Sequence, residues 1–175
     1  KPTAIAAMNI RPEQTTDMAA IAQVLTLAFG QNNEARLVEC LRQSNEFIPE
    51  LALVATVEQT IVGHILFTTA QLIGSASHPI LTLAPLAVHP RYQRQGIGSA
   101  LIQAGLAIAT QRSELLVTVL GHSDYYPRFG FEIAAEYNIH APFEVSKEAF
   151  MIWRSPRYTS ACQGTVVYPD CFSLV

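Results

Sequence analysis

The sequence predicts one α/β domain in which a mixed sheet carries helices on both faces, in the order β-α-α-β-β-β-α-β-α-β-β. β-rich apolar runs alternate with segments whose apolar residues recur at helical spacing. A strand, a helix and another strand follow one another within residues 80–120, and such a crossover joins parallel strands with a right-handed connection. The 175 residues, half of them apolar, suffice for one core, and no repeat or linker divides them. We expect a single domain over residues 8–175, with residues 1–7 as an upstream extension.

The first half of the chain predicts a helical hairpin between a first strand and three further strands. Asp17 and the threonines before it can cap a helix whose apolar spacing continues to Gly30. A second helix, capped by Asn32 or Asn33, has one apolar side. The polar residues 58–60 suit a hairpin turn. The expected strands are residues 8–11, 51–57, 61–69 and 80–88.

The second half predicts a long helix, a buried strand and a short aromatic helix. Residues 96–110 have helical spacing, and the apolar run 115–120 follows. Ser123 can cap a helix over 124–129, which Gly130 would close. The last two expected strands are residues 150–154 and 164–168.

Composition excludes several classes of protein. The formal net charge of −3 argues against a general nucleic-acid binder. No apolar run reaches membrane-spanning length and no signal peptide is recognisable, so we expect a soluble protein. Three cysteines without a Cys-x-x-Cys spacing argue against a disulfide framework and against a metal site. A reducing cytoplasm fits this composition best.

The turn between the third long strand and the long helix is the main candidate site. No Asp or Glu occurs between Glu58 and Glu114, whereas Arg91 and Arg94 lie beside two glycines. The free N–H groups and the dipole at the start of a helix favour an anion, and glycines let the backbone approach a diphosphate. The candidate phosphate-binding residues are Gln93, Arg94, Gln95, Gly96, Ile97, Gly98 and Ser99.

Two commoner nucleotide-binding motifs do not fit this turn. The Gly-x-x-x-x-Gly-Lys-Ser/Thr pattern of a hydrolytic P-loop is absent. A dinucleotide fingerprint would need a third glycine where Leu101 stands and an acidic residue about twenty positions later.

The turn does match Gln-x-x-Gly-x-Gly after a strand ending in Leu-x-Val-x-Pro, and here the chain resembles the GNAT superfamily of N-acetyltransferases. The resemblance implies acetyl-CoA as co-substrate, with its pyrophosphate in the turn. It also implies a bulged strand whose backbone pairs with the pantetheine arm, which assigns Leu86, Ala87 and Val88 to the cofactor. Pro85 supports a bulge independently, because proline lacks a ladder donor.

A second motif of the family follows one strand later. Its pattern is an apolar residue, then Tyr-x-x-x-Gly-Phe, which Tyr125, Tyr126, Gly130 and Phe131 match. Neighbouring helical residues point about 100° apart, so one tyrosine can pack in the core while the other faces the cofactor. We assign Tyr126 to the cofactor site as general acid.

Acetyl transfer to an amine requires three tasks. An amine attacks the thioester carbonyl, and the N–H of Val88 is our candidate donor to the resulting oxyanion. The hydroxyl of Tyr126 would protonate the leaving thiolate. The ammonium must lose a proton, but residues 80–88 contain none of the glutamates that many relatives carry there. His122 is our candidate base, with His64 and His89 as alternatives. The usual family asparagine is also missing from residues 119–122.

The predicted function is N-acetylation of a primary amine, on a small molecule or a protein, in the cytoplasm. The alternative is a CoA-binding regulatory module without efficient catalysis. The acceptor is expected between the first two helices and the loop 155–163, where Glu34, Glu39 and Glu46 could attract a cation, although exposed helix acids are usually only solvated. The apolar excess is compatible with a homodimer.

Overall fold

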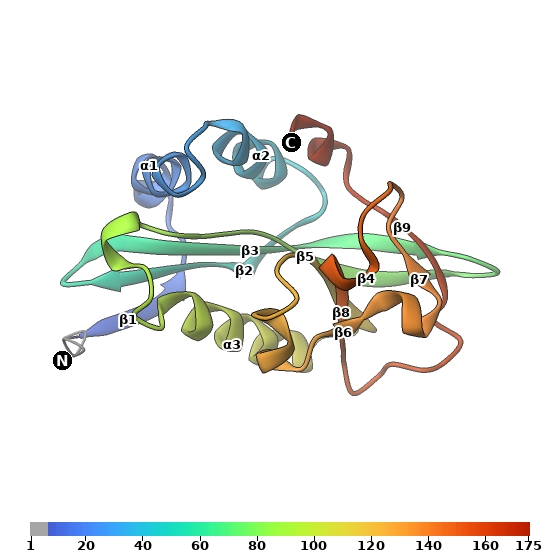
Figure 1. Cartoon of the computed structure of the whole chain (residues 1–175). Helices are drawn as coiled ribbons and strands as arrows, with labels where there is room; N and C mark the ends of the chain where they lie inside the picture. The colour runs from blue at the N-terminus through green and yellow to red at the C-terminus, as the bar shows by residue number, and fades with distance from the viewer. Residues whose placement is uncertain (1–6) are drawn as a thin grey trace.

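The computed structural model describes residues 7–175 and confirms the predicted fold class, a mixed sheet with helices on both faces (Figure 1). The expectation for residues 1–7 falls, except for Ala7, outside the described residues. The helices are α1 (Met18–Phe29), α2 (Asn33–Arg42) and α3 (Ile97–Thr110). The strands are β1 (Met8–Pro12), β2 (Phe47–Val57), β3 (Thr60–Ile73), β4 (Ser77–Val88), β5 (Leu116–Leu120), β6 (Glu132–Ile133), β7 (Ile139–His140), β8 (Phe150–Arg154) and β9 (Gly164–Val167).

The strands form one sheet with the path β1-β2-β3-β4-β5-β8-β6, while β9 pairs with both β3 and β7. All neighbours along the path are antiparallel except β4 and β5, which are parallel as the crossover through α3 predicts. The hairpin between β2 and β3 turns at Glu58 and Gln59, both with positive φ.

The core lies on both faces of this sheet because side chains alternate along each strand. Ile65 of β3 packs with α3 residues such as Leu101, whereas the adjacent Leu66 packs with Leu25 of α1 and Leu41 of α2. Figure 1 shows α1 and α2 on one side of the sheet and α3 on the other. The chain thereby buries the apolar sides of all three helices.

The two parallel strands separate soon after they meet. Only Leu81 and Thr82 of β4 pair with β5, although β4 continues to Val88. On its other side, β4 pairs with β3, and this pairing is interrupted at Ala84–Pro85. Between the pairs Phe67–Leu83 and Ile65–Leu86, β4 advances by three residues and β3 by two. This is the bulge that Pro85 predicts. From residue 83 to Val88, the backbone edge of β4 that faces β5 therefore has no neighbouring strand.

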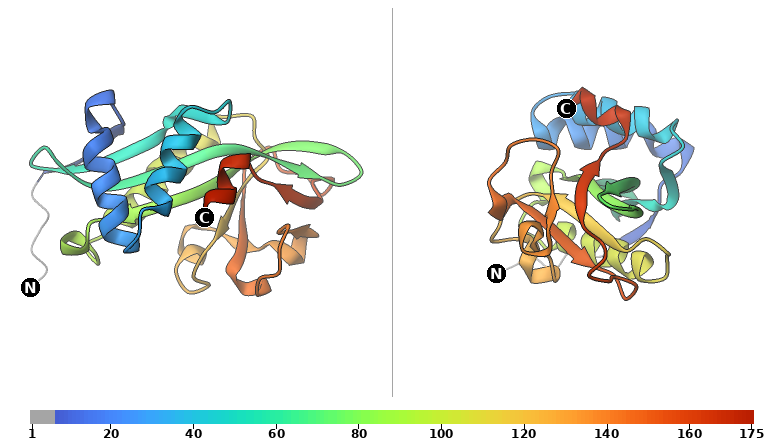
Figure 2. Two further views of the ribbon diagram at one scale, coloured as in Figure 1. Left: turned by 90° about the horizontal axis from the view of Figure 1, so that it is seen from above. Right: turned by 90° about the vertical axis from the view of Figure 1, so that its right-hand side faces the viewer.

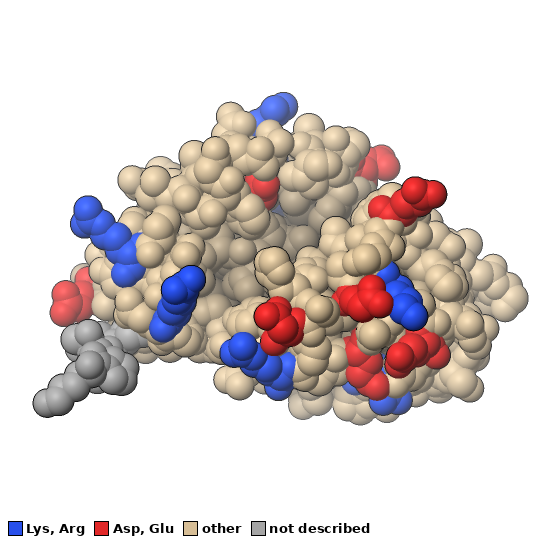
Figure 3. All heavy atoms as spheres, viewed as in Figure 1, with Lys and Arg blue, Asp and Glu red and all other residues tan. Residues whose placement is uncertain are grey.

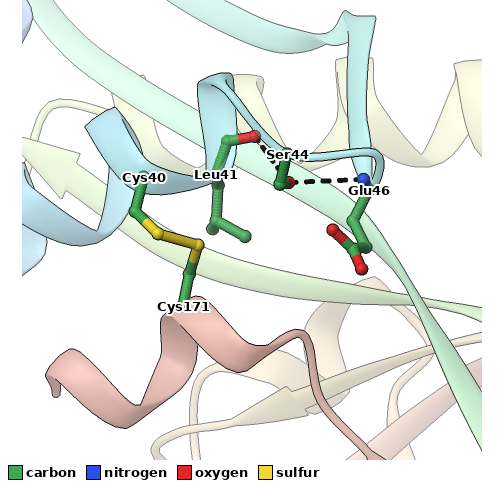
Figure 4. The surroundings of a disulfide bond; sticks show 5 residues. All are labelled: Cys40, Leu41, Ser44, Glu46 and Cys171. Atoms are coloured by element: carbon green, nitrogen blue, oxygen red, sulfur yellow. Dashed lines mark hydrogen bonds between the residues drawn. A yellow bond between two sulfur atoms is a disulfide. The ribbon is translucent and has the colours of Figure 1, made fainter.

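The prediction against a disulfide was wrong. Cys40 of α2 is bonded to Cys171 in the C-terminal 3₁₀ helix η6 (Asp170–Leu174), across 131 positions of sequence (Figure 4). Figure 2 shows this C-terminal segment beside α2. Three cysteines leave room for one bond, since the third cysteine, Cys162, is free and buried. The inference of a reducing cytoplasm loses its main support with this bond.

Short elements between β5 and β8 were also missed or displaced. The helix expected over 124–129 is a 3₁₀ helix, η3 (Tyr126–Phe129), with Gly130 as its left-handed C-cap. Ser123 does not cap it, since Tyr125 occupies the N-cap position. Strands β6 and β7 have two residues each, too short for any periodicity to reveal. In the described part of the chain, no helix is both long and apolar enough to cross a membrane.

Candidate functional site

A cleft of about 1300 Å³ opens where β4 and β5 separate. Its walls come from the end of β4, the start of α3, the aromatic turn after β5, the α1–α2 junction and the C-terminal segment. Figure 3 shows the surface hollowed below the two N-terminal helices, with mostly uncharged walls. A second hollow of about 600 Å³, beside Ile139 and Lys147, contains no predicted site residue.

The predicted phosphate turn forms one end of the cleft. Gly96 is the N-cap of α3 with φ +85°, and its carbonyl accepts the first helical hydrogen bond, from the N–H of Ala100. The N–H groups of residues 97–99 therefore have no partner within the helix. A Cβ on Gly98 would lie 3.1 Å from the hydroxyl oxygen of Tyr125, so a larger residue would fill the space above the turn.

Local hydrogen bonds explain the conformation of this turn. The side-chain amide of Gln93 donates to the carbonyl of Val88 at 3.1 Å. The Nδ1 atom of His89 accepts from the N–H of Arg91 at 3.1 Å, and the amide of Gln95 donates back to the Arg91 carbonyl at 3.3 Å. The sequence thus uses its polar side chains to close the turn and leaves the backbone N–H groups of the helix free.

The structure brings most of the predicted cofactor residues to one surface. The residues that line the cleft are Leu86, Val88, Gln93, Arg94, Gly96, Gly98, Ser99 and Tyr126. The side chains of Ala87 and Ile97 are instead buried, in the clusters under α1–α2 and under α3 respectively. Gln95 is exposed outside the cleft and stabilises the turn through its hydrogen bond to the Arg91 carbonyl.

The aromatic turn faces the phosphate turn across the cleft. Tyr126 is 8% exposed and belongs to the core, yet it also lines the cleft. Burial, with a smaller contribution from Tyr125, raises the pKa of Tyr126 to about 12. Within residues 7–175 we find no hydrogen-bond partner for its hydroxyl. Tyr125 lines the same cleft and approaches Ser99, with 3.4 Å between their hydroxyl oxygens.

Gly121 fixes the position of the Tyr126 ring. A Cβ on Gly121 would lie 2.3 Å from Cε2 of Tyr126, so the ring packs directly on the glycine backbone. Sequence reasoning missed this residue. The signal available was a glycine at the end of a buried strand, five positions before the tyrosine.

The three candidate histidines occupy different environments. His122 is exposed and lines the cleft. His64 is fully buried on the α1–α2 side of the sheet, where its Nε2 lies 3.1 Å from Oε1 of Glu13. His89 holds the phosphate turn through its backbone contact. Of the three, His122 is the one that lines the cleft.

Charge is distributed unevenly along the cleft. Arg94 and Arg128 line the cleft from the phosphate turn and the aromatic turn, while Glu34 supplies the single acidic side chain that lines it among the residues the structure describes. Arg112, from the same acid-free stretch of sequence as Arg94, contacts Glu114 and Glu50 at 2.6 Å and belongs to a different part of the surface. The basic side chains of the cleft wall thus come from the two turns, and its acidic side chain comes from α2.

The predicted acceptor wall was wrong in one part. The α1–α2 junction does line the cleft, but the loop 155–163 does not. Arg157 from this loop donates to the carbonyl of Thr110 at 2.8 Å, which ties the loop to the end of α3 on the opposite face. The C-terminal residues Tyr168, Phe172 and Val175 take its place.

Comparisons with known proteins agree with this geometry. The model of the acetyltransferase (GNAT) domain matches residues 49–133. The uncharacterized N-acetyltransferase YjhQ of Escherichia coli is 40% identical over 147 residues, which cover 83% of this chain and 81% of that protein. The crystal structure of the GNAT family N-acetyltransferase YhbS from E. coli, in complex with CoA, has a TM-score of 0.87 at 30% identity and covers 95% of this chain and 92% of that one.

A GNAT family acetyltransferase from Brucella melitensis, solved in complex with acetyl-CoA, has a TM-score of 0.77 at 32% identity, over 95% of this chain and 98% of the other. The resemblance that the two motifs predict thus extends over nearly the whole chain. This chain belongs to the GNAT family of N-acetyltransferases.

Proposed function

We propose that the protein transfers the acetyl group of acetyl-CoA to a primary amine. One observation carries the proposal: the unpaired end of β4, the first turn of α3 and Tyr126 line a single cleft. The relatives from E. coli and B. melitensis that were solved with CoA and with acetyl-CoA support the choice of co-substrate.

The cleft has the features that acetyl-CoA requires. The free N–H groups at the start of α3, with Arg94 beside them, would hold the pyrophosphate. Gly98 leaves room for it, since any side chain there would enter the cleft. The free backbone edge of β4 would pair with the amide groups of pantetheine, between the side chains of Leu86 and Val88. When bound, acetyl-CoA supplies an activated acyl group as a thioester.

Three groups of the chain would then serve the transfer. The neutral amine attacks the carbonyl carbon, and the N–H of Val88 stabilises the charge that develops on oxygen. Tyr126 donates a hydrogen bond to the departing sulfur. Because its pKa of about 12 lies well above the value of about 8.5 for an ordinary thiol, Tyr126 stabilises the thiolate by this bond more readily than by giving up the proton outright. His122, exposed at the cleft, passes the ammonium proton to solvent.

Release of free thiol from acetyl-CoA, followed with a panel of primary amines, tests the proposal. We expect amine-dependent release by the wild type and a loss of about 100-fold or more in kcat for Tyr126→Phe. Tyr158→Phe is the matched control, because Tyr158 packs in the cluster around β7–β9, outside the cleft. If CoA binds and no amine accelerates thiol release, transferase activity is refuted.

A further inference from the structure

The carboxylate of Glu34 lies in an unexpected environment. The helical pattern of α2 places Glu34 among its more exposed residues, yet Glu34 is only 9% exposed, comparable to core residues such as Ile61. Its partner is the side-chain amide of Gln31, which donates to Oε1 at 2.8 Å. A buried carboxylate is costly unless a positive charge or several donors accompany it. The same amide of the exposed Gln31 lies 3.3 Å from Oε2, so both carboxylate oxygens of Glu34 contact one neutral donor.

The walls around Glu34 are apolar. Among the described residues, nine large apolar side chains are exposed to solvent, and four of them line this cleft. These four are Phe29 at 42%, Leu120 at 49%, Phe143 at 48% and Val175 at 58% exposed. Concentration of exposed apolar side chains in a concave surface is typical of a binding site.

The basic side chains of the cleft come from other elements than Glu34. Arg94 and Arg128 come from the phosphate turn and the aromatic turn, and Arg128 stacks over the ring of Tyr125 at 5.4 Å. Glu34 comes from the first turn of α2, beside Leu37 of the same helix in the cleft wall. An anionic cofactor and a cationic acceptor would therefore meet complementary charge on different elements of one cleft wall.

We infer that Glu34 binds the ammonium group of the acceptor, whose body is apolar and packs on Phe29, Phe143 and Val175. This inference rests on the proposed function and names the acceptor class for it: a primary amine carried on an aromatic or aliphatic body, in preference to polyamines and to amino acids with free carboxylates. Glu34 is a specificity-determining residue here, and the proton that the ammonium group loses still passes to His122.

The test compares Glu34→Gln with the wild type on two aromatic primary amines that differ in charge. Phenethylamine carries an ammonium group at neutral pH, whereas aniline is neutral. We expect Glu34→Gln to raise the KM for phenethylamine about 10- to 100-fold, with kcat and the KM for aniline changed less than about threefold. Glu39→Gln is the matched control, because Glu39 lies on the exposed side of the same helix. Wild type should also prefer phenethylamine to spermidine and to glutamate in kcat/KM.

Two further results separate this inference from the proposed function. Calorimetric titration of phenethylamine into protein saturated with CoA measures the ammonium contact without turnover, and Glu34→Gln should weaken this binding by the same factor. Equal KM and Kd values in the two proteins would overturn the inference while leaving acetyl transfer intact. A fall in kcat with unchanged KM would overturn it too, because Glu34 would then act on the proton and not on acceptor binding. If the wild type binds phenethylamine in this titration but acetylates no amine, the proposed function would be refuted instead.

Discussion

The bond between Cys40 and Cys171 gives the most quantitative prediction of the structure. It closes a loop of 131 positions and attaches the C-terminal segment to α2. In the chain-entropy description of a cross-link, a loop of this length lowers the entropy of the unfolded chain by about 17 cal/mol/K, or about 5 kcal/mol at 25 °C. Because native bonds commonly contribute less than this limit, the double variant Cys40→Ser/Cys171→Ser should lose about 2–5 kcal/mol in free energy of unfolding.

Urea unfolding of the wild type and the double variant, after equilibration in an oxidising glutathione buffer, measures this difference. Reductant should lower the stability of the wild type towards that of the variant and leave the variant unchanged. Thiol titration of the unfolded wild type without reductant should find one free thiol, that of Cys162. Three free thiols, or equal stabilities with and without reductant, would refute the pairing.

Further predictions concern Tyr126, its support and a buried ion pair. Gly121→Ala, whose methyl would lie 2.3 Å from the Tyr126 ring, should lower kcat at least about tenfold in the thiol-release assay while CoA affinity stays within about twofold. Since the pKa of Tyr126 is raised to about 12, kcat should show no alkaline loss attributable to it up to about pH 10. Burial alone would raise the pKa of Glu13, but hydrogen bonds with His64 and Arg42 outweigh it and lower that pKa. A carboxyl group whose pKa is lower in the folded than in the unfolded chain stabilises the fold at pH values above its unfolded pKa. The free energy of unfolding should therefore fall as the pH drops from about 5 towards 3. Urea titrations of Glu13→Gln should show a smaller fall over this pH range.

Periodicity and turn chemistry predicted the parts of the fold that are long or strongly patterned. The crossover through α3 needs fourteen helical residues between two apolar strands, and this arrangement admits few alternatives. Pro85 indicated the bulge because a proline cannot donate to the ladder. Strands of two residues carry no periodic signal, and they form where another strand offers an edge: β6 pairs with β8, and β7 pairs with β9.

One part of the candidate site could be predicted from the sequence and another part could not. The phosphate turn is contiguous in sequence, so its residues could be found together. The proposed acceptor site is assembled from α2, the loop before β8 and the C-terminal segment, which are far apart in the chain. The sequence around Glu34 is that of an exposed helix acid, because its burial depends on where α2 packs in the fold. The pairing of Cys40 with Cys171 depends likewise on the packing of α2 against the C-terminal segment.

Titration of CoA into the wild type and into Gly98→Val tests the central claim, that the first turn of α3 holds the cofactor. The valine side chain would enter the cleft, since even a Cβ at this position lies 3.1 Å from the Tyr125 hydroxyl. We predict that the wild type binds CoA and that Gly98→Val, with an unfolding free energy within about 1 kcal/mol of the wild type, binds it at least about tenfold more weakly. Equal CoA affinity in the two proteins, or no CoA binding by the wild type, would contradict the account.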